Sequence, residues 1–266
     1  MIRGAAVAML GKIVRERPRN PLMRIPRIYL PQPLTRGATV ALDERAFNHA
    51  VRVLRLKVGA PLRLFDGQGT ACAARLVEIG KRAAWAEVAD TLPGDVESPL
   101  RLVLVQGIAR GEKTDFILQK AVELGVAVFQ PVFTGRGGVD LQGERLERRI
   151  QHWRGIVVSA CEQCGRNRLP ELRPPLPLDD GLRLAAEPGL RLLLDPLAEQ
   201  GVRTLTPPTG AVTLLIGPEG GLDAAEIARA RAAGFSGVRL GPRVLRTETA
   251  GLAALAALQA LWGDWI

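Results

Sequence analysis

The sequence is poor in the residues that build disulfide frameworks, metal sites and base-stacking surfaces. Its 266 residues include 3 cysteines, 2 histidines, 6 Phe, 4 Trp and 1 Tyr. An odd and small number of cysteines excludes a disulfide scaffold and favours a reducing, cytoplasmic environment. So few aromatic residues cannot form a surface that binds nucleic acid mainly by stacking its bases. No uninterrupted apolar run reaches the roughly 18 residues of a transmembrane helix, so no membrane span is predicted.

The spacing of Cys161 and Cys164 is the CxxC spacing of redox and zinc sites, but the sequence offers this pair no complete ligand set. A structural zinc ion takes four ligands, and the two histidines, His49 and His152, lie far from each other in unlike segments. We therefore predict no metal and interpret both cysteines as small residues near the end of a helix. Neither histidine is predicted to be a general base; both are interpreted as packed or surface residues.

Positive charge is in excess and is unevenly distributed. Lys and Arg number 36 against 27 Asp and Glu, which gives a net charge of +9. Residues 1–22 hold five basic residues and one acidic residue, and we predict that they form an unstructured or non-native extension upstream of a second possible start at Met23. The excess of Lys and Arg favours a polyanionic partner, because neutralising phosphates releases condensed counterions.

Two hydrophobicity patterns divide the rest of the chain. Residues 27–90 contain short strands, turns and one helical interval, which is typical of a small β-barrel. After a linker at 92–99, apolar strands alternate with amphipathic helices, as in a parallel sheet covered on both faces. The sequence thus predicts an α/β protein with a β-barrel at 23–95 and an α/β domain at 98–266, although the proline-rich segment 166–190 shows no assignable element. The predicted strands are 27–30, 38–42, 61–65, 70–79, 83–90, 100–108, 127–133, 190–195, 211–216 and 236–240, and the predicted helices are 43–57, 112–124, 143–162, 223–233 and 248–262.

Three loops that follow strands of the α/β domain are predicted to bind a ligand. They begin at Leu194, Gly217 and Leu240, and open parallel sheets bind ligands beyond the carboxyl ends of their strands. The glycines of the second loop, GPEGG at 217–221, allow backbone amides to approach a ligand closely. This loop is no phosphate-binding P-loop and the chain holds no complete dinucleotide fingerprint, so ATP and NAD chemistry are not favoured. A tight turn before a helix is the alternative interpretation.

Arg246 lies directly before a predicted helix, in the sequence RTET. Thr247 or Thr249 can cap this helix, and Glu248 suits its first turn. A positive charge at this position is opposed by the helix dipole, so capping does not explain Arg246. We therefore predict a functional role for this side chain.

Six stretches of the chain, in the same order, resemble the RsmE family of bacterial 16S rRNA uracil-N3 methyltransferases, within the knotted SPOUT superfamily. The resemblance extends from Met23 to Ile266, and its last two stretches are highly specific together. The stretches are MRIPRIYL at 23–30, HAVRVLRLKVGAPLRLFDGQG at 49–69, KTDFILQKAVELGV at 113–126, ACEQCGR at 160–166, LLIGPEGGL at 214–222 and LGPRVLRTETA at 240–250.

The resemblance implies a PUA-like, RNA-binding β-barrel followed by a SPOUT methyltransferase domain with a C-terminal trefoil knot at about 190–262. It implies S-adenosylmethionine as the methyl donor and a homodimer whose active site uses both subunits. The implied reaction is methylation at N3 of a specific uridine in the decoding region of 16S rRNA, on the assembled small ribosomal subunit. Two alternatives remain open: a SPOUT methyltransferase acting on 23S rRNA or tRNA, and a non-enzymatic rRNA-binding assembly factor.

The resemblance also implies roles for individual residues. Arg246 would stabilise negative charge on the uracil ring, and Glu219 would orient the cofactor or target, or accept the proton. The expected cofactor-binding residues are Leu194, Gly217, Glu219, Gly220, Leu240, Gly241, Leu245, Arg246 and Thr247. The expected RNA-binding residues are Arg45, Arg52, Arg55, Lys57, Arg63, Arg110 and Lys113, each of which could instead cover apolar surface.

Overall fold

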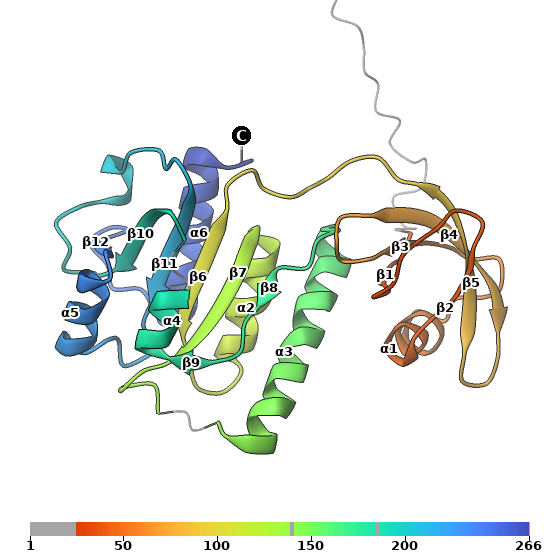
Figure 1. Cartoon of the computed structure of the whole chain (residues 1–266), viewed down its shortest axis with the longest axis horizontal. Coiled ribbons are helices and arrows are strands. Elements are labelled where there is room, and N and C mark those ends of the chain that lie inside the picture. Colours follow the sequence, from red (N-terminus) through yellow and green to blue (C-terminus); the bar gives the residue numbers. More distant parts are fainter. Residues whose placement is uncertain (1–24, 139–140, 185–186, 266) are drawn as a thin grey trace, which may run out of the picture.

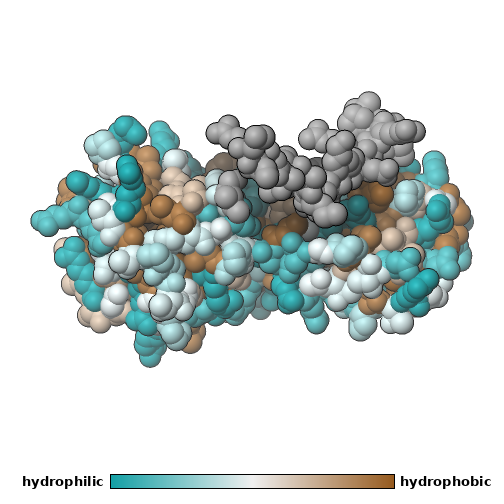
Figure 2. All heavy atoms as spheres, turned by 90° about the horizontal axis from the view of Figure 1, so that it is seen from above, coloured by the Kyte–Doolittle hydropathy of each residue, from teal (hydrophilic) through white to brown (hydrophobic). Residues whose placement is uncertain are grey.

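The computed structural model describes residues 25–138, 141–184 and 187–265. The predicted extension at 1–22 therefore lies outside the described residues. Two lobes are joined by an extended linker (Figure 1), a smaller β-sheet lobe at the N-terminal side and a larger α/β lobe. Across the described residues, no helix has both the length and the apolar content needed to cross a membrane. Seen from above, hydrophilic residues are spread over both lobes (Figure 2).

The smaller lobe is a five-stranded sheet in the order β1-β3-β4-β5-β2. Strands β1 and β3 pair in parallel, and the other neighbours pair antiparallel. No ladder between β1 and β2 is found in the described part of the chain, so the barrel is half-closed. Its core is apolar and includes Leu62, Leu64 and Leu76. The strands are β1 (Arg27–Tyr29), β2 (Thr39–Ala41), β3 (Pro61–Phe65), β4 (Ala71–Ile79) and β5 (Ala84–Thr91).

The helical interval of the barrel is distorted. Helix α1 (Glu44–Phe47) begins at Asp43, whose side chain accepts a hydrogen bond from the backbone of Ala46 at 2.7 Å, and it continues as the π-helix η1 (Asn48–Val53). Arg55 then adopts a φ of 54°, the one positive value at a non-glycine residue in the described ranges. A left-handed residue with a side chain costs about 1–3 kcal/mol, and π-helices occur frequently at functional sites. The local backbone thus points to a function for this segment.

The larger lobe contains a parallel sheet in the order β12-β10-β11-β6-β7-β8, and β9 also pairs with β7. Strands β6 and β11 are buried along their whole length, as the prediction of continuous apolar strands requires. This confirms the predicted fold class, a barrel followed by a parallel α/β domain; the trefoil knot stays a prediction. The strands are β6 (Leu102–Gly107), β7 (Val126–Phe133), β8 (Glu171–Leu172), β9 (Leu176–Pro177), β10 (Gly189–Leu194), β11 (Ala211–Ile216) and β12 (Ser236–Val238).

Helices cover both faces of this sheet. Alternate residues of β6 face opposite sides: Leu102 and Leu104 pack in one hydrophobic cluster, Val103 and Val105 in another. The first cluster includes residues of α2 (Lys113–Glu123), α3 (Gly143–Cys164) and α6 (Thr247–Trp262). The second includes residues of α4 (Leu178–Leu184) and α5 (Ala224–Ala232). A short 3-10 helix, η2 (Val202–Thr204), follows β10.

The segment 166–190, which the sequence left unassigned, is more regular than expected. It contains β8, β9 and α4 and reaches the first residues of β10. Both strands are two residues long and pair with β7, and α4 has seven residues. Two residues are too few for a strand to show alternation, and α4 spans only about two turns, so the sequence pattern did not reveal these elements.

Candidate functional site

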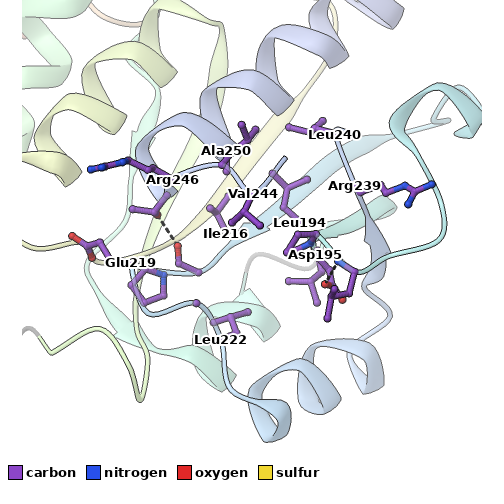
Figure 3. A pocket seen from close by; sticks show the side chains of 18 of the residues that line it. Leu194, Asp195, Ile216, Glu219, Leu222, Arg239, Leu240, Val244, Arg246 and Ala250 are labelled. Atoms are coloured by element: carbon purple, nitrogen blue, oxygen red, sulfur yellow. Dashed lines mark hydrogen bonds between the residues drawn. The ribbon is translucent and has the colours of Figure 1, made fainter. Parts of the chain in front are cut away.

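A cavity of about 550 Å³ lies at the carboxyl ends of β10, β11 and β12. Leu194, Ile216 and Val238 are the last residues of these three strands, and all three line it. In Figure 3 the side chains of Leu194, Ile216 and Val244 gather around its centre. The cavity therefore lies at the strand ends where the sequence predicts a ligand, and its wall is largely apolar.

Eight of the nine expected cofactor-binding residues line this cavity. Gly220 is the exception: a Cβ on it would lie 2.9 Å from the Cβ of Arg136, so this glycine allows close packing between two loops. Sequence reasoning missed most of the apolar lining, because residues at the ends of buried strands resemble core residues. The eight expected residues are Leu194, Gly217, Glu219, Leu240, Gly241, Leu245, Arg246 and Thr247. The further lining residues include Leu193, Ile216, Leu222, Ile227, Val238, Arg239, Val244, Glu248 and Ala250.

The loop after β11 is a tight turn as well as part of the cavity wall. The amide of Gly221 donates to the carbonyl oxygen of Pro218 at 2.9 Å, and Gly221 has a φ of 68°. A Cβ on Gly107 would lie 2.6 Å from the Cδ of Pro218, so the loop packs directly on the end of β6. The two interpretations of this glycine-rich loop are thus compatible: the glycines are required for the turn, and the turn shapes the cavity.

A buried hydrogen-bond network fixes the start of α6 to this loop. The hydroxyl of Thr247 donates to the carbonyl oxygen of Gly217 at 2.7 Å, and Figure 3 shows a hydrogen bond between these neighbouring elements. The side-chain amide of Gln106 donates to the Thr247 Oγ1 at 3.0 Å and to the Gly107 carbonyl oxygen at 3.0 Å. Gln106 is fully buried, so these bonds are protected from water. The Thr247 hydroxyl therefore holds two walls of the cavity together.

Glu219 is held in place on one side of the cavity. Its Oε1 accepts a hydrogen bond from the backbone of Arg110 at 3.1 Å and lies 3.1 Å from the Lys113 Nζ. Partial burial alone would raise the pKa of this carboxyl, but hydrogen bonds from its own backbone, from Lys113 and from Arg110 bring the pKa below its usual value. A lowered pKa makes this carboxylate a weaker proton acceptor. The geometry therefore favours an orienting role for Glu219 over a role as general base.

Arg246 occupies the N-cap position of α6 and makes no side-chain capping bond. Its side chain is exposed. Within the described part of the chain, its guanidinium has no hydrogen bond or ion pair. Figure 3 shows it extending away from the apolar centre, on the side where Glu219 lies. A cation that the protein leaves unpaired at the edge of a cavity is available to an anionic or polarised ligand.

The expected RNA-binding residues fall into three groups. Arg110 and Lys113 lie beside the cavity, where both contact Glu219. Arg45 instead lies at the junction of the lobes and pairs with Glu162. The remaining four are exposed on the barrel: Arg52, Arg55, Lys57 and Arg63.

The cysteines and histidines lie away from the cavity. Cys161 is buried and Cys164 is half-buried in the last turn of α3. His152 Nε2 lies 2.7 Å from the Asp115 Oδ2, a partner that the sequence did not suggest. His49 pairs with Glu162. Over residues 25–138, 141–184 and 187–265, no group of three or more His, Cys, Asp or Glu side chains is arranged to hold a metal ion.

Comparisons with known proteins agree with this architecture. A family model described as an RNA methyltransferase domain matches residues 96–259, and a model of the RNA methyltransferase PUA domain matches residues 42–89. The ribosomal RNA small subunit methyltransferase E of Buchnera aphidicola subsp. Schizaphis graminum is 34% identical over 241 residues, which cover 91% of this chain and 98% of that protein. The protein of the same name from Buchnera aphidicola subsp. Acyrthosiphon pisum is 31% identical over 242 residues, which cover 91% of this chain and 96% of that protein.

A solved structure is also similar over nearly the whole chain. It is the crystal structure of a ribosomal RNA small subunit methyltransferase E from Neisseria gonorrhoeae bound to S-adenosyl methionine. The two chains share 43% sequence identity with a TM-score of 0.88, and the match covers 91% of this chain and 100% of the other. The likeness therefore includes both lobes.

Proposed function

This chain belongs to the ribosomal RNA small subunit methyltransferase E family, and we propose that it methylates N3 of one uridine in the decoding region of 16S rRNA. Membership makes it an RNA methyltransferase that uses S-adenosylmethionine. The observation that carries the finer proposal is the cavity at the ends of β10, β11 and β12. At its edge lies the guanidinium of Arg246, which no described residue pairs with.

The cavity suits the cofactor in size and chemistry. Its volume of about 550 Å³ lies within the range of pockets that enclose drug-sized ligands. Apolar side chains such as Leu194, Leu240 and Leu245 can cover a flat ring, and the loops at Gly217 and Gly241 bring backbone close to the ligand. We assign cofactor binding to these residues, with Thr247 fixing the loop that carries Gly217.

Methyl transfer requires that the uracil lose its N3 proton and that its ring be held in line with the methyl group. When bound, S-adenosylmethionine would supply an electrophilic methyl on its sulfonium. The N3 proton would pass to solvent, the N3 anion would bond to the methyl carbon, and the sulfur–carbon bond would break to leave the neutral thioether S-adenosylhomocysteine. Arg246 stabilises the negative charge that the ring carries after deprotonation, because its guanidinium is always charged and has no competing partner in the described chain. Glu219, held by Lys113 and the backbone of Arg110, orients the reacting groups.

The barrel supplies an RNA-docking surface, which we define as the exposed residues of η1 and the loop after it: Arg52, Val53, Leu54, Arg55, Lys57 and Val58. Three cations are interleaved with three exposed apolar residues there, and Val53 is 70% exposed. Cations bind phosphates and the apolar residues pack on unstacked bases. In Figure 1, α1 and the carboxyl ends of the strands around β6 both lie toward the lower side of the view. A target base leaves its stack to reach the cavity.

A second copy of the chain is part of the proposal. Leu197 and Val244 line the cavity and are 89% and 81% exposed, so one side of the binding site presents apolar side chains to solvent. A homodimer that covers them would complete the cavity and exclude water from the reacting atoms.

The proposed function is tested by methyl transfer from labelled S-adenosylmethionine. Assembled small subunits from a strain that lacks this gene, free 16S rRNA, 23S rRNA and tRNA are compared as substrates, and the modified nucleoside is identified after digestion. We expect N3-methyluridine from small subunits. Label in 23S rRNA or tRNA alone, or no transfer to any RNA, would overturn the proposal.

A further inference from the structure

One carboxylate, that of Glu162, joins the two lobes through three separate elements of the barrel. Its Oε1 accepts hydrogen bonds from the backbone of Tyr29 at 3.0 Å and from the Arg45 Nη2 at 3.0 Å. Its Oε2 lies 3.1 Å from the His49 Nδ1. Glu162 belongs to α3 of the larger lobe, whereas its partners belong to β1, α1 and η1.

This carboxylate is buried, with a side-chain exposure of 5%. Taking a carboxylate out of water is costly unless its oxygens are well paired. Burial alone would raise the pKa of Glu162, yet hydrogen bonds from His49, Arg45 and the backbone of Tyr29 bring it below its usual value. The site is therefore built for an ionised carboxylate, and its loss would leave barrel donors unpaired.

A second set of contacts holds the lobes together without touching η1. The Nη2 of Arg27 donates to the carbonyl oxygen of Arg166 at 3.0 Å and to the Asn167 Oδ1 at 2.7 Å. The backbone of Gly69 donates to the carbonyl oxygen of Asn167 at 3.2 Å. These bonds join β1 and the loop after β3 to the segment that follows α3. Without Glu162 the lobes would therefore stay attached, while α1 and η1 would lose the contacts of Arg45 and His49 with the larger lobe.

Helix α3 also connects this junction to the cavity. It has 22 residues and is thus about 33 Å long at a rise of 1.5 Å per residue. Midway along the helix, the Trp153 Nε1 donates to the Asp115 Oδ1 at 2.8 Å. Asp115 lies in the first turn of α2, which begins with Lys113, a residue that lines the cavity. A continuous series of packed elements therefore runs from the cavity through α2 and α3 to η1.

We infer that Glu162 is a positioning residue for the RNA substrate, which fixes the docking surface of η1 relative to the methyl-transfer cavity. The inference rests on the proposed role of η1 in RNA docking. Glu162 contacts neither the cavity nor the docking surface itself; it acts through His49 and Arg45. Its effect should therefore appear in the use of RNA and not in the binding of S-adenosylmethionine.

The test uses Glu162→Gln in the full-length protein, with Glu147→Gln as the matched control. Glu147 is exposed on the same helix, so both variants remove one negative charge from α3. For Glu162→Gln we expect the KM for small subunits to rise about tenfold, with kcat at saturation and the Kd for S-adenosylmethionine within about twofold of wild type. The control should match wild type in all three constants.

A second variant separates positioning from general destabilisation. His49 is half-buried, and His49→Gln removes the ring that meets Glu162 while keeping a polar side chain. We expect a rise in KM of about threefold for this variant, and for the double variant a KM close to that of Glu162→Gln alone, because both changes break one contact. A Glu162→Gln variant that keeps the wild-type KM, or that loses cofactor binding along with RNA use, contradicts the inference. If wild type methylates no RNA, the proposed function fails; if wild type is active and Glu162→Gln equals Glu147→Gln, only the positioning role fails.

Discussion

Replacement of Arg246 by alanine tests the catalytic assignment most directly. The guanidinium has no partner in the described chain, so its removal leaves no protein group unpaired, and thermal stability should stay near that of wild type. At about 4 Å and an effective dielectric constant of about 20, a unit charge stabilises an opposite charge by about 4 kcal/mol. Arg246 is exposed, and water screens part of this interaction. Loss of one donor to a developing anion typically lowers kcat by about 10²–10³, and we expect the lower end of that range.

The assay for Arg246→Ala is single-turnover methyl transfer to small subunits at saturating cofactor, together with a calorimetric Kd for S-adenosylmethionine. Arg243, an exposed arginine in the same loop, provides the comparison. If the charge acts through a specific contact, Arg243→Ala should lower the rate far less. Near-normal turnover with unaltered cofactor affinity in Arg246→Ala would refute the catalytic assignment. Equal losses of rate in Arg246→Ala and Arg243→Ala would also refute it, because they would indicate a general effect of positive charge.

Three further predictions concern the network, the docking surface and the cysteine pair. Thr247→Val removes the hydroxyl that links Gln106 to Gly217, so we expect a loss of about 1–3 kcal/mol in the free energy of unfolding and weaker cofactor binding, measured by denaturant titration and calorimetry. Glycine adopts the positive φ of 54° at position 55 without strain, so Arg55→Gly should raise the free energy of unfolding by about 1 kcal/mol. It should also raise the KM for small subunits, because it removes a cation of the docking surface; an arginine with a purely structural role would not change this KM. A hydrogen bond from Cys161 outweighs burial and lowers the pKa of Cys164 to about 7, so the thiolate is present above that pH and is lost as pH falls through it. Alkylation followed by mass spectrometry should therefore label Cys164 with a rate that rises through pH 7, and should label buried Cys161 only after unfolding.

The sequence predicted the elements whose burial produces a recognisable pattern of apolar and polar residues. Strands β6 and β11 are covered by helices on both faces, so every residue is apolar or buried and the run is continuous. The sequence showed the π-helix η1 only as part of a helical interval with apolar residues at Ala46, Ala50, Val53 and Leu54. In the structure Ala46 and Ala50 are buried, whereas Val53 and Leu54 are exposed, so the apolar spacing did not reveal the change of helix type. Strands β8 and β9 were not predicted, because each has two residues and is a strand only through its pairing with β7, which the local sequence does not show.

The same distinction applies to the site. Arg246 was found because a positive charge directly before a helix is opposed by the helix dipole, and Glu219 was found through the resemblance to the family. Val238 and Ile216 were missed because their apolar side chains are equally suited to a core. Glu162 was missed for a different reason. Its partner Tyr29 is separated from it by 133 residues, and no local pattern shows that an acidic residue between two cysteines will meet a backbone amide of another lobe.

The distribution of charge over the structure shows where RNA can be attracted. Residues 98–266 hold 20 basic and 18 acidic residues, so the larger lobe has almost no net charge to offer a polyanion. In the barrel, Arg36 pairs with Asp90, and Arg45 is occupied by Glu162. Arg52, Arg55, Lys57 and Arg63 have no ion pair among the residues that the structure describes. Opposite charges within a Debye length largely cancel in the field that a phosphate experiences, so cations without an ion pair attract it most strongly. On the barrel these four are joined by the exposed side chains of Lys81 and Arg82. Three of the four, Arg52, Arg55 and Lys57, belong to the proposed docking surface. On this proposal, Glu162 decides where bound RNA lies relative to the cavity, because it fixes the position of that surface.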